Sequence, residues 1–149
     1  MFDTTPKIVL DQSETFDDTG DTRTYAWMVA DPTRPARIVL AYTDAFGALG
    51  TSPQVNNLDL TVASGGQTYL GNRFQMNVST TGGSSDNKNN YEAVFLSAGA
   101  SNLTITVTAA NIAGDGVPGS GDATDQDFAL VCSNCVRESI FADGFEASQ

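Results

Sequence analysis

The chain has 149 residues, and seven lysine and arginine residues against 18 aspartate and glutamate residues give it a formal net charge of -11. This length favours one domain with its own hydrophobic core. The negative charge argues against binding to nucleic acid or to anionic membrane surfaces, because both repel it. The sequence contains no histidine, so it lacks the commonest general base and cannot build a Ser–His–Asp triad. We therefore expect a domain without catalytic residues. No apolar run approaches the roughly 20 residues needed to cross a bilayer, so we also expect no membrane span.

Apolar residues recur with a period of two along most of the chain, which is typical of β-strands. In chain order, the predicted strands cover residues 8–10, 23–30, 37–43, 57–63, 67–71, 93–96, 102–110 and 126–131. Tyr25, Trp27 and Val29 share one face of the second strand, so we expect Trp27 in the core. Gly65 and Gly66 predict a tight hairpin turn. About eight strands with several long connections predict an all-β fold, a two-sheet antiparallel β-sandwich of the jelly-roll type.

The chain divides into a single β-sandwich domain over residues 1–135 and a C-terminal tail over 136–149. Two polar segments, 79–90 and 114–122, are predicted loops, and we expect the second to be a flexible connection. The tail contains the sequence IFADGFE and is similar to a short element at the ends of exported proteobacterial proteins, which implies secretion. A frayed end, or an apolar cover for the edge of the sandwich, is the alternative.

Oxygen-bearing side chains gather at the starts of two predicted strands, in VNNLDL at 55–60 and in DNKNNYEAVFL at 86–96. In the first of these strands Asn57 and Asp59 point to one face, and Leu58 and Leu60 point to the other. Carboxylate, amide and carbonyl oxygens are the ligands that calcium prefers, at roughly six to eight per ion. Clustered carboxylates are also costly without a cation. The two clusters therefore predict a calcium site between neighbouring strands.

The candidate calcium ligands come from separate parts of the chain. They are Asp44, Asn57, Asp59, Asn90 and Glu92, with Asn72 and Asp86 as weaker candidates. Two alternatives remain open. Asn56, Asn57 and Asn90 are residue types that cap turns and satisfy backbone groups, and the acidic residues would also suit an ordinary solvated surface.

The only two cysteines, Cys132 and Cys135, form a single CxxC pair at the end of the last predicted strand. One pair is an incomplete structural zinc site. Redox pairs usually lie at a strand-to-helix turn, whereas this one leads into a polar tail. We therefore expect a local disulfide that pins the end of the domain in an oxidising compartment.

Four short motifs follow one another in a recognisable order. They are Tyr42-Thr43-Asp44 after an apolar strand, VN-LDL at 55–60, Tyr69 with Gly71 and Asn72, and NN-E at 89–92. In this order the motifs resemble the C-terminal β-sandwich, a P-domain-like jelly roll, that follows the catalytic domain of many secreted bacterial subtilisin-like serine proteases. The resemblance covers roughly residues 22–131.

The resemblance implies a non-catalytic and often calcium-binding accessory domain of a serine endopeptidase. Its partner would be the catalytic protease domain of the same polypeptide, which it would stabilise or position, and it could help to engage a protein substrate. The implied location is extracellular, after secretion from a bacterium. Family members commonly carry Asp where this chain has Asn57, so one negative charge of the implied site is absent here.

A carbohydrate- or collagen-binding module of an exported protein is the alternative function. Jelly rolls also serve as carbohydrate-binding modules that stack sugars on exposed aromatic rings. Tyr69, Tyr91 and Phe46 are the surface candidates for such a role, although Tyr69 and Tyr91 also belong to the motifs above.

Overall fold

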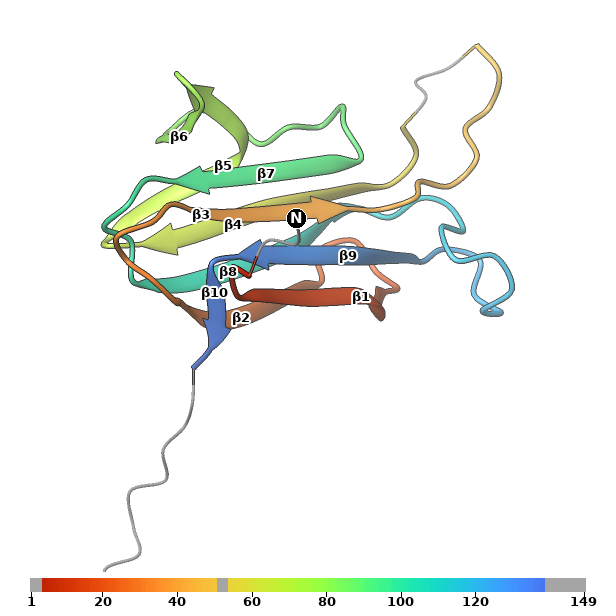
Figure 1. Cartoon of the computed structure of the whole chain (residues 1–149). Helices are drawn as coiled ribbons and strands as arrows, with labels where there is room; N and C mark the ends of the chain where they lie inside the picture. The colour runs from red at the N-terminus through yellow and green to blue at the C-terminus, as the bar shows by residue number, and fades with distance from the viewer. Residues whose placement is uncertain (1–3, 51–53, 139–149) are drawn as a thin grey trace, which may run out of the picture.

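The computed structural model describes residues 4–50 and 54–138. Within them the chain forms ten strands in two antiparallel sheets that face each other, with no helix (Figure 1). The strands are β1 (Lys7–Phe16), β2 (Thr22–Val29), β3 (Ala36–Ala41), β4 (Asn57–Ser64), β5 (Gln67–Gln75), β6 (Val78–Thr81), β7 (Tyr91–Leu96), β8 (Asn102–Asn111), β9 (Gln126–Ser133) and β10 (Cys135–Arg137). The all-β prediction is confirmed.

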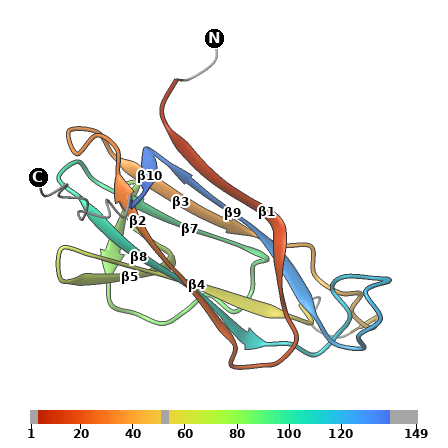
Figure 2. The same cartoon turned by 90° about the horizontal axis from the view of Figure 1, so that it is seen from below.

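The order of the strands is that of a jelly roll with two additional edge strands. One sheet runs β1-β9-β3-β7 and the other β10-β2-β8-β4-β5-β6. Four antiparallel pairs, β1 with β9, β2 with β8, β3 with β7 and β4 with β5, are nested within the chain. Winding such nested pairs into two sheets produces the jelly roll. The view from below shows both layers (Figure 2).

The core lies between the sheets and is built by alternate residues of each strand. Ile38 and Leu40 of β3 and Leu58 and Leu60 of β4 are at most 1% exposed, because the period-two pattern turns every second side chain inward. Trp27 is buried as predicted, at 4% exposed. The same alternation leaves Asn57 and Asp59 on the outer face of β4, half-buried.

Two hairpins connect β4, β5 and β6. Gly65 and Gly66 both have positive φ, at 57° and 75°, which suits the predicted tight turn between β4 and β5. The turn between β5 and β6 was missed by the sequence analysis. It is made by Met76 and Asn77, whose φ angles are 50° and 67°, and Asn tolerates this left-handed region better than most residues.

Two edge strands were also missed. The segment 79–90 was predicted to be a loop, but its first residues belong to β6, which pairs with β5. β10 pairs with β2 and extends to Arg137, two residues beyond the expected end of the sandwich domain. Both strands are short and lack an alternating apolar pattern, so period two could not reveal them. The remaining tail, 139–149, lies outside the described residues.

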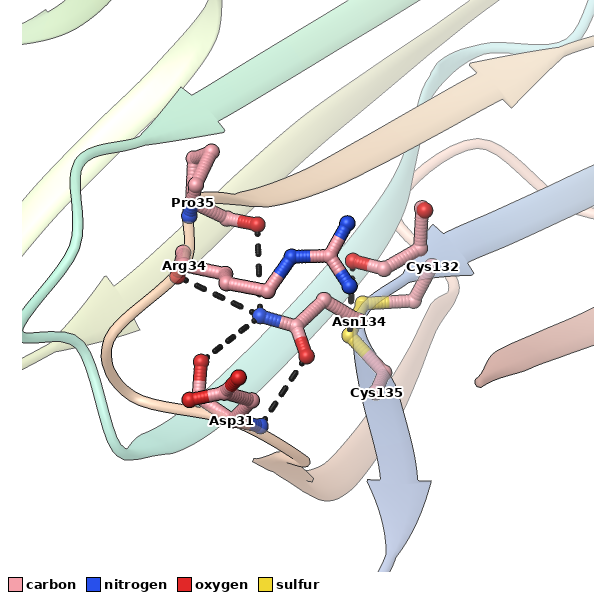
Figure 3. The surroundings of a disulfide bond; sticks show 7 residues. Asp31, Arg34, Pro35, Cys132, Asn134 and Cys135 are labelled. Atoms are coloured by element: carbon pink, nitrogen blue, oxygen red, sulfur yellow. Dashed lines mark hydrogen bonds between the residues drawn. A yellow bond between two sulfur atoms is a disulfide. The ribbon is translucent and has the colours of Figure 1, made fainter. Parts of the chain in front are cut away.

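Cys132 and Cys135 form a disulfide at the point where the chain leaves β9 and enters β10 of the other sheet (Figure 3). Both cysteines are at most 1% exposed. Between them, Asn134 has a positive φ of 64° and is 2% exposed. Its side chain bonds to the backbone of Asp31, Arg34 and Pro35 in the β2–β3 connection. The crossing between the sheets is therefore fixed by one covalent bond and one buried amide.

The described part of the chain contains no helix that is long and apolar enough to cross a membrane.

Candidate metal site at the junction of β4, β5 and β7

The candidate site lies where β4 and β5 separate. Their pairing begins at the turn and its last pair is Thr61 with Leu70. Beyond this point, the backbone N–H of Leu60 donates instead to Oε2 of Glu92, at 2.5 Å. Glu92 belongs to β7 in the opposite sheet and is fully buried. A carboxylate from one sheet thus occupies the gap that opens between two strands of the other.

Gly71 of β5 makes room for this carboxylate. A Cβ atom on Gly71 would lie 2.1 Å from Oε2 of Glu92 and 2.7 Å from its Cβ. Neither separation is possible for real atoms, so any larger residue at this position would force β5 and β7 apart. The close approach of the Glu92 side chain therefore explains why the Tyr69–Gly71–Asn72 motif has a glycine at position 71.

The environment of Glu92 disfavours a negative charge. Burial raises the pKa of Glu92 to about 8, and the nearby carboxylates of Asp59 and Asp86 raise it further, whereas the hydrogen bond from Leu60 and the nearby backbone of Asp86 act in the opposite direction. Its second oxygen, Oε1, is buried and has no hydrogen-bond partner among the described residues. A buried carboxylate oxygen without a partner is rare in native proteins and calls for an explanation such as a bound ion.

Asp59 and Asn57 lie together on the outer side of β4. Nδ2 of Asn57 donates to Oδ1 of Asp59 at 2.9 Å, and Nε2 of Gln54 donates to Oδ1 of Asn57 at 3.0 Å. The structure therefore places these two predicted ligands side by side, with Asp59 within electrostatic reach of Glu92. The amide oxygen of Asn57 is already engaged by Gln54.

Asn72 and Asp86 form the other side of the junction. Nδ2 of Asn72 donates to Oδ2 of Asp86 and to the carbonyl of Tyr91, both at 2.8 Å. Oδ1 of Asn72 accepts the N–H of Ala93 at 3.0 Å. Partial burial raises the pKa of Asp86, but hydrogen bonds from Asn72, Asn89 and Lys88 outweigh it and lower the pKa below its usual value. Asn72 therefore serves the backbone of β7 and positions Asp86 rather than presenting a free oxygen.

Asp44 and Asn90 are engaged elsewhere. The carboxylate of Asp44 accepts the backbone N–H groups of Val55 and Asn56, both at 2.8 Å, and so closes the base of the β3–β4 loop. Nδ2 of Asn90 donates to the carbonyl of Tyr42 at 3.0 Å. For Asn90 the structure thus supplies the backbone partner that the turn-capping alternative requires, and it gives Asp44 backbone partners as well.

Asn56 is a buried residue whose side chain makes several hydrogen bonds to residues distant in the sequence, although the sequence suggested only a turn cap. It is fully buried, and its Nδ2 donates to the carbonyls of Gly114 and Asp125 and to Oε1 of Gln126. Its Oδ1 accepts the N–H groups of Ala113 and Gly114. Asn56 thus ties the β3–β4 loop to the 114–122 segment, and the two loops project from the same end of the sandwich (Figure 1).

The Gly-rich segment 114–122 has more defined contacts than the expected flexible connection. Buried Asp125 accepts the N–H of Val117 at 3.0 Å and the hydroxyl of Ser120 at 2.5 Å. The sequence of residues 114–122 does not predict these contacts, because the carboxylate that accepts the hydrogen bonds belongs to Asp125, which follows the segment.

The carboxylates of the junction do not form a ready-made metal cage. Among the residues that the structure describes, no group of three or more His, Cys, Asp or Glu side chains is placed to hold a metal ion. What the junction offers is one buried carboxylate with an unpartnered oxygen, a glycine cradle beneath it, and the carboxylates of Asp59 and Asp86 within electrostatic reach. These features fit a hard cation that would also draw on backbone carbonyls and water.

Comparison with protein-family models finds no match to this chain, and comparison with curated proteins finds none either.

Proposed function

We propose that this chain is a non-catalytic, calcium-binding accessory domain of a secreted subtilisin-like serine protease. In this role it stabilises or positions the catalytic domain of the same polypeptide. Glu92 is the central calcium ligand, and Asp59 and Asp86 add carboxylate oxygens from either side of the junction.

The observation that carries the calcium proposal is the unpartnered, buried Oε1 of Glu92. Leaving an ionised carboxylate buried without a partner costs several kcal/mol, so the group either takes up a proton or binds a cation. A calcium ion would neutralise the charges of Glu92, Asp59 and Asp86 together. It would also join β4, β5 and β7, and so link the two sheets at the place where β4 and β5 separate.

The assignment to a protease accessory domain is supported by the way the four motifs contact one another. Asp44 of the first motif bonds to Val55 and Asn56 of the second. Glu92 of the fourth motif bonds to Leu60 of the second and lies against Gly71 of the third. Motifs that are far apart in the sequence thus form one continuous network, as expected if they are a shared structural unit.

Thermal unfolding with calcium and with chelator tests the metal proposal. We expect calcium to raise the melting temperature, because a ligand that binds only the folded state stabilises it by mass action. Asp59→Ala should lower the melting temperature in calcium and barely change it in chelator. Asp17→Ala is the matched control, because Asp17 is exposed and lies outside the junction.

Two results would contradict the metal proposal. One is an unchanged melting temperature together with no heat in a calorimetric calcium titration. The other is an equal loss of stability for Asp59→Ala in calcium and in chelator, which would make Asp59 a structural residue only.

Sequencing the coding region upstream of codon 1 tests the protease assignment separately. We expect the reading frame to encode a catalytic domain with the Asp, His and Ser residues of a subtilisin-like protease. An upstream frame that encodes an unrelated protein would overturn the assignment and leave the calcium proposal intact.

A further inference from the structure

We propose that the pocket between the β4–β5 turn, β6 and the β7–β8 connection binds a neutral sugar unit of a polysaccharide. The pocket has a volume of about 350 Å³, which is at the lower end of the range for small-molecule sites. It shares no lining residue with the Glu92 junction, so this inference is independent of the calcium proposal.

Three elements that are separate in the sequence build the walls. The ends of β4 and β5 on either side of their turn supply Ser64 and Gln67, β6 supplies Ser79, and the β7–β8 connection supplies Ser97 and Ser101. In Figure 1 the turn and the connection lie at the end of the sandwich opposite the β3–β4 loop, and β6 lies above β7. Because β-hairpins and sheet-bonded strands hold these elements in place, the pocket exists before any ligand arrives.

The lining is polar but carries no charge. Serine hydroxyls and the Gln67 amide line it, and no Asp, Glu, Lys or Arg side chain does, although the chain as a whole has 25 such residues. A charged ligand would lose hydration here without gaining an opposite charge. A neutral ligand with several hydroxyl groups would instead exchange its water for hydroxyl and amide partners, each of which can both donate and accept.

Tyr69 provides the aromatic wall that a sugar ring needs. Its ring is half-buried and packs against the core, so its position is fixed before binding. The hydroxyls of Tyr25 and Tyr42 are hydrogen-bonded to Glu14 and to the carbonyl of Asn56, whereas within the described residues the hydroxyl of Tyr69 has no hydrogen-bond partner. A rigid ring with an unused hydroxyl suits the apolar face and the hydroxyl rim of a pyranose.

The hydroxyl group of Ser79 can donate a hydrogen bond to a ligand in this pocket. Its Oγ accepts the backbone N–H of Phe95 at 2.9 Å, which fixes the rotamer of the side chain. The hydroxyl proton of Ser79 therefore remains available to donate to a ligand oxygen. Val78 and Leu96 also line the pocket and give it an apolar patch next to the hydroxyl groups.

Calorimetric titration of the whole chain with cellohexaose, chitohexaose and maltohexaose tests the proposal. Polygalacturonate is the acidic probe and a collagen-model peptide is the protein probe. The titrations are run in chelator, so that their result does not depend on the calcium site. We expect saturable binding of at least one neutral hexasaccharide and weaker or no binding of the two other probes.

Two test variants and one control variant locate the binding. Ala98→Phe places a large side chain in the pocket from an exposed position and should weaken the sugar affinity by about tenfold or more, since the ring would occupy the ligand volume. Ala110→Phe is the matched control at an exposed position outside the pocket. Tyr69→Phe should weaken the affinity several-fold with an unchanged melting temperature, because only one hydrogen bond is lost.

The proposal is overturned if no neutral hexasaccharide binds at low-millimolar concentration, or if the collagen peptide or polygalacturonate binds in their place. It is also overturned if Ala98→Phe and Ala110→Phe bind the sugar equally well.

Discussion

Asn134 and Glu92 are both buried polar residues at places where the two sheets are joined, but their hydrogen bonding differs. Asn134 uses both ends of its amide, since Oδ1 accepts the N–H of Asp31 at 2.9 Å and Nδ2 lies 2.9–3.3 Å from the carbonyls of Asp31, Arg34 and Pro35 (Figure 3). Glu92 uses one oxygen and leaves the other unpartnered. The difference indicates that the protein itself satisfies the hydrogen bonding of Asn134, whereas Glu92 requires a proton or a cation.

Replacing Asn134 should have the largest effect on stability. Asn134→Ala would remove the side-chain partner of backbone groups of Asp31, Arg34 and Pro35, and it would leave alanine, which has no polar side chain, at a φ of 64°. We expect a loss of about 3 kcal/mol in the free energy of unfolding, measured by denaturant titration, and the same loss in calcium and in chelator. Asn134→Gly, which relieves the backbone strain alone, is the control and should recover only part of the loss. If the stability loss of Asn134→Ala depended on calcium, Asn134 and Glu92 would no longer differ in their need for an ion, and the comparison would fail.

Replacing Gly71 with a larger residue should cause the second-largest loss of stability. Gly71→Ala places a Cβ on top of the Glu92 side chain, and overpacking of this kind costs about 2 kcal/mol. We expect a lower midpoint in denaturant and no response to calcium. The double variant with Glu92→Gly should be less destabilised than the sum of the single changes, because the clash is then absent. Strict additivity would show that the two residues do not meet.

A dependence of stability on pH in chelator should be the smallest of these effects over any single pH unit. Because the pKa of Glu92 is raised from 4.5 to about 8 on folding, the folded state holds a proton that the unfolded state releases between these values. The contribution of Glu92 to stability should therefore be fully present below pH 4.5 and should fall by about 1 kcal/mol per pH unit up to pH 8. Saturating calcium should remove this decline, since the ion replaces the proton.

Glu92→Gln is the control for the pH experiment, because its neutral amide cannot titrate. We expect a flat stability profile for this variant at pH 5–8 in chelator, and no gain from calcium. A decline of equal slope in the wild type and in Glu92→Gln would assign the dependence to other carboxyl groups.

Much of the fold was predictable because alternation is a local signal. In β3 and β4 every second residue is apolar and buried, and two adjacent glycines marked the hairpin between β4 and β5 correctly. β6 and β10 were missed because each is short and lies at a sheet edge, where polar residues are as acceptable as apolar ones. The Met76–Asn77 turn was missed because Met carries no signal for a positive φ.

The candidate site was only partly predictable. The sequence indicated that Asp59 and Glu92 belong together, and the structure places their carboxylates within electrostatic reach. It could not indicate that Asp44 and Asn90 would be taken by backbone groups of Val55, Asn56 and Tyr42, since those partners are brought close only by the fold. The sequence also did not predict that Glu92 points inward, because a charged residue is rarely expected between two sheets.

The contacts that β7 makes through Asn72 and Ser79 have a further consequence for the behaviour of the domain in solution. β7 is the last strand of its sheet, and such an edge can pair with a strand of a neighbouring molecule. Here the carbonyl of Tyr91 and the N–H groups of Ala93 and Phe95 are already bonded to the two side chains. An incoming strand would find these positions occupied, so this edge is protected against the growth of intermolecular sheets at high protein concentration.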